Sequence, residues 1–122
     1  MNVTSALAYS PRSYINPIYC ATKAFMHSFT VNLRTQLEKA DSRNKVVEIV
    51  PPLAESDLHR DRKDPDDNKK GKNPGALSVE EFMEGVIKGY EKEEETIAPG
   101  MAGQAVKAWY DTFGDKYKEA TK

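Results

Sequence analysis

The sequence has one cysteine, two histidines and no long apolar run. The single cysteine, Cys20, cannot form an internal disulfide, and no group of cysteines and histidines has the spacing of a zinc site. No stretch approaches the roughly 18 consecutive apolar residues that would span a bilayer, and no basic and apolar segment typical of a secretory signal is present. These absences predict a soluble cytoplasmic protein without a metal site or a membrane contact.

Neither positive nor negative charge is in clear excess. The 18 Lys and Arg residues almost balance the 19 Asp and Glu residues, which leaves a formal net charge of -1. Such a surface offers no basic field to a polyanion, so the composition argues against nucleic acid as a partner. The 122 residues suffice for one domain or part of one. A small molecule or another protein is the expected partner.

The first half of the chain predicts a strand, a loop, a helix and a second strand. Residues 2–5 resemble the end of a strand, and the prolines and small polar residues of 6–18 are typical of a loop. From Tyr19 to about Lys39, one apolar stripe recurs once per turn and predicts a helix that packs on a sheet. The stripe contains Phe25, Met26, Phe29, Leu33 and Leu37. Residues 46–50 form a β-branched run that two prolines end, as in a buried parallel strand. The order predicts an α/β fold with a βαβ crossover.

The second half begins with a charged segment. Residues 55–76 contain almost no apolar side chain after Leu58, so we expect a mobile, solvated loop. Ser78 and Glu81 then form a capping box that predicts a helix start. Gly85 and Gly89 each destabilise a helix by about 1 kcal/mol relative to alanine, which favours tight packing on their side. Residues 96–98 are a candidate strand. A last helix is predicted, with one stripe of Met101, Ala105, Trp109, Phe113 and Tyr117.

Tyr19 and Lys23 form the pair with the clearest chemical meaning. They lie one helical turn apart, so their side chains can share a face. A neighbouring ammonium favours the phenolate form of a tyrosine, which would let Tyr19 exchange protons near neutral pH. A Tyr-x-x-x-Lys pair also arises by chance in a lysine-rich chain, as a solvated lysine beside a packing tyrosine. The context favours chemistry, because Ser5 ends the preceding strand and ligand sites gather at the carboxyl ends of parallel strands.

Three blocks resemble the short-chain dehydrogenase/reductase family in order and spacing. They are residues 2–8 (NVTSALA), 19–24 (YCATKA) and 46–58 (VVEIVPPLAESDL). The helix is most similar to that of bacterial and fungal oxidoreductases that read YxATKAxxHSFT. This resemblance implies a partial Rossmann-like, NAD(P)-binding fold, of which residues 1–122 are the carboxyl-terminal half. The amino-terminal strands, with the glycine-rich phosphate loop and the catalytic asparagine, are then expected to be missing.

The resemblance also implies the roles of the site residues. Tyr19 would be the general acid and base for a carbonyl or alcohol substrate, and Ser5 would hold the substrate oxygen. Lys23 would favour the phenolate of Tyr19 and bind the nicotinamide ribose.

The cofactor implied by the family is NAD or NADP. Pro52, Ala54 and Ser56 fall on the segment that meets its nicotinamide end, with Ser56 replacing the commoner threonine. Without a helix amino terminus for the pyrophosphate, we expect weak binding of the cofactor by this chain.

An alternative of another class is a non-catalytic remnant or interaction protein that uses the helix 19–39 as an oligomer surface. Family members commonly dimerise through this helix, so a homo-oligomer is possible in either case. His27 is interpreted as structural, and Trp109, Phe113 and Tyr117 as core or subunit contacts. Asp66 and Asp67 lack further ligands and do not predict a metal site.

Overall fold

A small parallel sheet lies at the centre of the molecule. The structure is a computed structural model that describes residues 1–122. Its strands β1 (Asn2–Val3), β2 (Glu48–Ile49) and β3 (Thr96–Ile97) have the order β1-β2-β3. Both strand pairs are parallel, with Val3 opposite Ile49 and Ile49 opposite Ile97. The predicted α/β class is therefore confirmed, although the strands are shorter than the sequence suggests.

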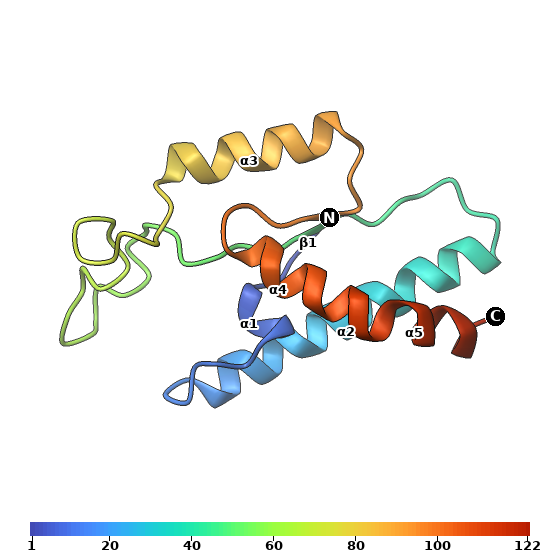
Figure 1. The fold of residues 1–122 in the computed structure, drawn as a ribbon, viewed down its shortest axis with the longest axis horizontal. Helices are drawn as coiled ribbons and strands as arrows, with labels where there is room; N and C mark the ends of the chain where they lie inside the picture. Colours follow the sequence, from blue (N-terminus) through green and yellow to red (C-terminus); the bar gives the residue numbers. More distant parts are fainter.

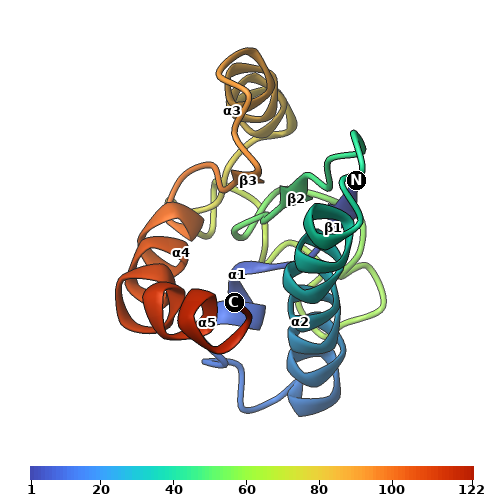
Figure 2. The same ribbon diagram turned by 90° about the vertical axis from the view of Figure 1, so that its right-hand side faces the viewer.

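Helices cover both faces of this sheet. They are α1 (Ala6–Tyr9), α2 (Pro17–Lys39), α3 (Val79–Glu91), α4 (Ala102–Trp109) and α5 (Asp115–Ala120), with a π-helical turn η1 (Tyr110–Gly114) between the last two. Figure 1 shows α3 set apart from the other helices, next to the turns of the charged segment. Seen along the sheet, α3 lies on one face, and α1, α2, α4 and α5 lie on the other (Figure 2).

The predicted loop 6–18 contains helical residues at both ends. Ser5 caps α1, because its Oγ accepts the N–H of Leu7 at 3.2 Å. α2 begins at Pro17, two residues before the predicted start at Tyr19. Proline suits the first turn of a helix, where its missing N–H would have no intrahelical partner. The earlier start of α2 is a local capping effect within a correctly predicted helix, whereas α1 was not predicted.

The face of α2 that packs on the sheet was predicted only in part, since three of the five residues of the predicted stripe are half-buried and two are exposed. Phe25 and Phe29 are 66% and 49% exposed, and their rings stack on each other with centroids 6.4 Å apart. Thr30 instead turns inward and accepts a hydrogen bond from Asn2 Nδ2 at 2.9 Å. The buried residues of α2 are Cys20, His27, Thr30 and Val31. Polar contacts to the strands, rather than the bulkiest stripe, orient this helix.

α3 has the predicted start and the predicted close contact. Ser78 Oγ accepts the N–H of Glu81 at 3.1 Å, and the Glu81 carboxylate accepts the N–H of Ser78 at 2.9 Å, which confirms the capping box. A Cβ atom added at Gly89 would lie 2.6 Å from Ile97 Cγ2. Val86 and Ile97 are buried with Ile49 in a small apolar core on this face. The glycine therefore permits the close approach of α3 to β3.

The predicted carboxyl-terminal helix is interrupted. A π-helical turn between α4 and α5 adds to the residues per turn, so one stripe cannot stay on one face. Met101 and Phe113 are 61% and 49% exposed, whereas Trp109 and Tyr117 are partly buried. No helix in the molecule combines the length and the apolar character that crossing a membrane requires.

Candidate functional site

The predicted site residues lie at the carboxyl ends of β1 and β2. Ser5 lies two residues after the end of β1 and is 7% exposed. The next residue, Ala6, donates its N–H to the carbonyl oxygen of Pro51 at 3.0 Å. This backbone contact joins the end of β1 to the segment that carries Pro52. Ser5 and the segment Pro52–Ser56 are therefore positioned by neighbouring strands.

Lys23 connects Tyr19 to β1. Its Nζ lies 5.7 Å from the centroid of the Tyr19 ring and donates to the Val3 carbonyl oxygen at 3.2 Å. Tyr19 is 37% exposed, and its hydroxyl makes no hydrogen bond within the chain. No hydrogen bond joins Ser5 to either residue. The structure thus provides an accessible phenol beside an ammonium, a pairing that can exchange a proton with a bound molecule.

The segment after β2 is held by Asn68, which the sequence did not single out. Asn68 is 1% exposed. Its Nδ2 donates to the carbonyl oxygens of Ala54 and Ser56 at 3.3 and 3.2 Å, and to Ser56 Oγ at 3.0 Å. A bridge between Ala54 and Leu77 closes the same loop. Part of the charged segment is therefore packed around the buried Asn68 amide. In the sequence, Asn68 differs from its charged neighbours only in that it carries no charge.

The buried carboxylate of Glu48 lies next to the end of β1 and the short helix α1. Glu48 is 0% exposed, although it stands in the apolar run 46–50. It accepts hydrogen bonds from Thr4 Oγ1 at 2.8 Å and from Tyr9 OH at 2.9 Å. His27 Nδ1 lies 3.2 and 3.3 Å from its two oxygens. The only sequence signal was a single acidic residue in the middle of a predicted buried strand.

The surroundings of Tyr9 keep its hydroxyl protonated. Burial raises the pKa of Tyr9 far above its usual range, and the nearby negative charge of Glu48 raises it further. Arg34 acts weakly in the opposite direction. The protonated Tyr9 hydroxyl therefore donates to Glu48.

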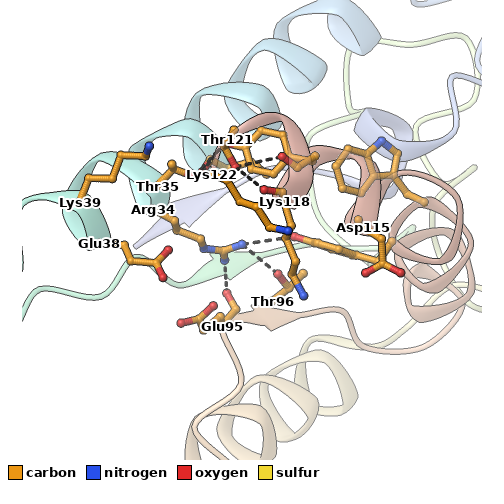
Figure 3. A pocket seen from close by; sticks show the side chains of 15 residues that line it. Arg34, Thr35, Glu38, Lys39, Glu95, Thr96, Asp115, Lys118, Thr121 and Lys122 are labelled. Carbon is orange, nitrogen blue, oxygen red and sulfur yellow. Dashed lines mark hydrogen bonds between the residues drawn. The ribbon is translucent and has the colours of Figure 1, made fainter.

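A separate cavity of about 800 Å³ lies at the other end of the sheet. Figure 3 shows Arg34 at its centre, reaching from α2 toward the start of β3. The guanidinium donates to the carbonyl oxygens of Val46 (2.9 Å) and Glu95, and to Thr96 Oγ1 and Tyr110 OH (both 3.3 Å). All three of its nitrogens are thus engaged by the protein. Residues of both charges line the cavity, so it presents no single-sign site for a ligand.

No three His, Cys, Asp or Glu side chains come together in an arrangement that could hold a metal ion.

Comparisons with known proteins found a similar curated protein. No family model and no solved structure matches the sequence. The uncharacterized oxidoreductase DltE of Bacillus subtilis (strain 168) is 35% identical over 97 residues. The match covers 80% of this chain and 36% of DltE, so the chain spans about a third of the length of this curated relative. The name of this relative describes it as an oxidoreductase.

Proposed function

We propose that the chain carries the proton-transfer site of an NAD(P)(H)-dependent oxidoreductase that acts on a small carbonyl or alcohol. The observation that carries the proposal is the position of Lys23, which contacts both the Tyr19 ring and the carbonyl at the end of β1. The identity with DltE supports the same class. The finer proposal is a Rossmann-like fold of the short-chain dehydrogenase/reductase type, with residues 1–122 as its carboxyl-terminal half.

Each side chain has the bonding capacity that its role requires. The Tyr19 hydroxyl can donate a proton to the carbonyl oxygen of a substrate, or accept one from an alcohol in the reverse direction. Ser5 Oγ accepts a backbone N–H, so its own O–H is free to hold the substrate oxygen. Lys23 has three donors and gives one to Val3, so two are left for the hydroxyls of a ribose.

The nicotinamide end of NAD or NADP fits this arrangement better than its phosphates do. When bound, the nicotinamide supplies or accepts the hydride. Lys23, Pro52, Ala54 and Ser56 would hold this end, with Ser56 fixed by Asn68. No glycine-rich turn follows β1 or β2, so these strands offer the pyrophosphate no backbone cradle. Low affinity for the whole dinucleotide is expected.

The test compares two tyrosines that differ in environment. Tyr19→Phe removes only the phenol oxygen, and Tyr14→Phe makes the same change at a residue that is 92% exposed. NADPH and NADH oxidation is measured with a panel of small carbonyls, on the chain and on a chimera in which it replaces the matched region of DltE. We expect Tyr19→Phe to lower kcat by about 100- to 10,000-fold, as for loss of a general acid, and Tyr14→Phe to leave it unchanged. Activity of Tyr19→Phe within a few-fold of the parent would remove Tyr19 from the chemistry.

A second candidate function is a non-catalytic interaction through α2, with a second copy of the chain as partner. Ile18, Phe25 and Phe29 are 79%, 66% and 49% exposed on this helix. From Pro17 to Gln36, none of its exposed residues is charged. A solvent-facing helix normally carries charged side chains on its outer face. The molar mass in solution tests this proposal.

A further inference from the structure

The Glu48 carboxylate accepts hydrogen bonds from residues that precede and follow Ser5 in the sequence. Thr4, which precedes Ser5, donates to one carboxylate oxygen, and Tyr9 donates to the other. Tyr9 is the last residue of α1, the short helix that Ser5 caps. A single buried group therefore fixes the end of β1 and the helix that follows it.

His27 makes the corresponding link to α2. It lies one turn after Lys23, and its Nδ1 faces both oxygens of Glu48 at 3.2 and 3.3 Å. Because a carboxylate only accepts hydrogen bonds, Nδ1 carries the proton in this contact. The imidazole also packs against the rings of Tyr9 and Trp109, with centroids 4.1 and 4.6 Å away. Nε2 is buried without a partner, so the only polar anchor of the ring is Glu48.

Stability alone does not explain a fully buried carboxylate at this position. Apolar residues of similar volume commonly stabilise a fold as well as a buried ionic network does, or better. A buried carboxylate with several donors has a different consequence, because it tolerates only the arrangement that satisfies it. Here that arrangement sets the position of β1 and α1 relative to α2, the elements that carry Ser5, Tyr19 and Lys23.

We propose that Glu48 is the positioning carboxylate of the proton-transfer site, acting through Thr4, Tyr9 and His27, a role that rests on the proposed function. Glu48 does not contact substrate or cofactor. By holding α2 against β1, it keeps the Lys23 ammonium at the Val3 carbonyl and beside the Tyr19 ring. A displacement of about 1 Å in such a site can cost roughly 100-fold in rate.

Matched variants separate the hydrogen bond from the bulk of the side chain. His27→Asn keeps an N–H close to the position of Nδ1, whereas His27→Phe keeps a ring and removes the donor. Glu48→Gln preserves the shape and removes the charge. Glu84→Gln is the control, because Glu84 makes an exposed ion pair with Lys88 at 2.8 Å on the distant helix α3. If Glu48→Gln does not fold, Tyr9→Phe removes one donor from the same carboxylate.

The first measurement is independent of activity. In the labelled 122-residue chain, NMR follows the hydrogen exchange of the Ala6 and Leu7 amides, which report the Pro51 contact and the Ser5 cap. The shift of the Lys23 ε-methylene reports its place beside Tyr19. We expect His27→Phe and Glu48→Gln to unfold cooperatively but to lose at least about tenfold in amide protection, with the Lys23 shift moving to that of an exposed lysine. His27→Asn and Glu84→Gln should match the parent.

The opposite result overturns the proposal. If His27→Phe and Glu48→Gln keep the parent's amide protection and Lys23 shift, Glu48 does not position the site. The same conclusion follows if His27→Asn loses as much protection as His27→Phe, because a retained N–H donor would then fail to hold the site.

The second measurement separates this proposal from the proposed function. In the DltE chimera, we expect His27→Phe and Glu48→Gln to lower kcat by about 100-fold while the KM for the carbonyl changes less than about threefold, with His27→Asn restoring kcat. Absence of turnover in the parent chimera would reject the proposed function, and the NMR result would still decide whether Glu48 fixes the Lys23 contact. Turnover in the parent with kcat unchanged in both variants would reject only the positioning role.

Discussion

At the scale of single residues, Tyr9 has a strongly raised pKa. In the fold its hydroxyl is held neutral, because burial and then the charge of Glu48 raise its pKa. In the unfolded chain a tyrosine titrates near pH 10. A folded-state pKa above the unfolded value means that its contribution is fully present below about pH 10 and is lost as the pH rises further.

Tyr9→Phe should therefore change how the free energy of unfolding depends on pH under alkaline conditions. At pH 8 the variant leaves Glu48 without one donor and should lose about 1 to 3 kcal/mol in the free energy of unfolding. Above about pH 10 the wild-type chain loses up to roughly 1.4 kcal/mol per pH unit through Tyr9, and the variant does not. The difference between the two should shrink as the pH rises, as measured by urea unfolding at pH 8, 10 and 11.

Tyr14→Phe is the control for this experiment, because Tyr14 is 92% exposed and should not alter the pH dependence. A difference between wild type and Tyr9→Phe that stays constant from pH 8 to 11 would contradict the account of Tyr9.

At the scale of elements, the packing of α3 on β3 depends on the absence of a side chain. Gly89 is buried, and a methyl group there would meet three atoms of Ile97, the nearest at 2.6 Å. Ile97 is itself 1% exposed, so it has little room to move. The contact requires glycine for steric reasons, since Gly89 does not have a positive φ.

Gly89→Ala brings two opposing effects together. Alanine favours the helix by about 1 kcal/mol, whereas overpacking a core typically costs about 1 to 3 kcal/mol. Because Ile97 has little room to move, we expect the overpacking cost to be the larger, with a net loss of up to about 2 kcal/mol measured as a lower urea midpoint by circular dichroism. Gly71→Ala is the matched control, because nothing lies within 4 Å of its added Cβ atom and its stability should hold or rise slightly. A Gly89→Ala variant as stable as the wild type would show that α3 can shift away from β3.

Sequence patterns predicted some features of these helices correctly and others only in part. The capping box at Ser78 and the tight packing at Gly89 were predicted and confirmed, because both depend on a few neighbouring residues or on one missing side chain. The inward face of α2 was predicted only in part. Its choice depends on polar partners in β1 and β2, such as Asn2 for Thr30, that lie far away in the sequence.

At the scale of the whole molecule, the chain exposes more surface than its size requires. A compact monomer of this mass is expected to have about 6,600 Å² of accessible surface, and this chain has 8462 Å². Only 16 of its 122 residues are buried. Large stable interfaces bury more than about 2,000 Å² in total over both partners. The excess is therefore of the size that a permanent partner could cover.

The uncharged face of α2 is where we expect a second copy to bind. Replacing Phe25 and Phe29 together by serine should convert a dimer into a monomer, because the two stacked rings are the largest exposed apolar group on that helix. Light scattering with size-exclusion chromatography at about 50 μM gives the molar mass. Leu58→Ser is the control, since Leu58 is 76% exposed on the charged loop and should not affect assembly. A wild-type chain that is monomeric at this concentration would exclude the homodimer.

The sequence by itself determined the order of strand, helix and strand, the start of α3 and the spacing of Tyr19 and Lys23. These features follow from periodicity, proline and capping residues, whose physics acts over a few residues. Only the tertiary structure decided that Glu48 is buried, that His27 faces it, and that Asn68 holds the segment at Ser56. A polar group can be buried only where its partners meet it, and the partners of Glu48 are brought together from three elements by the fold.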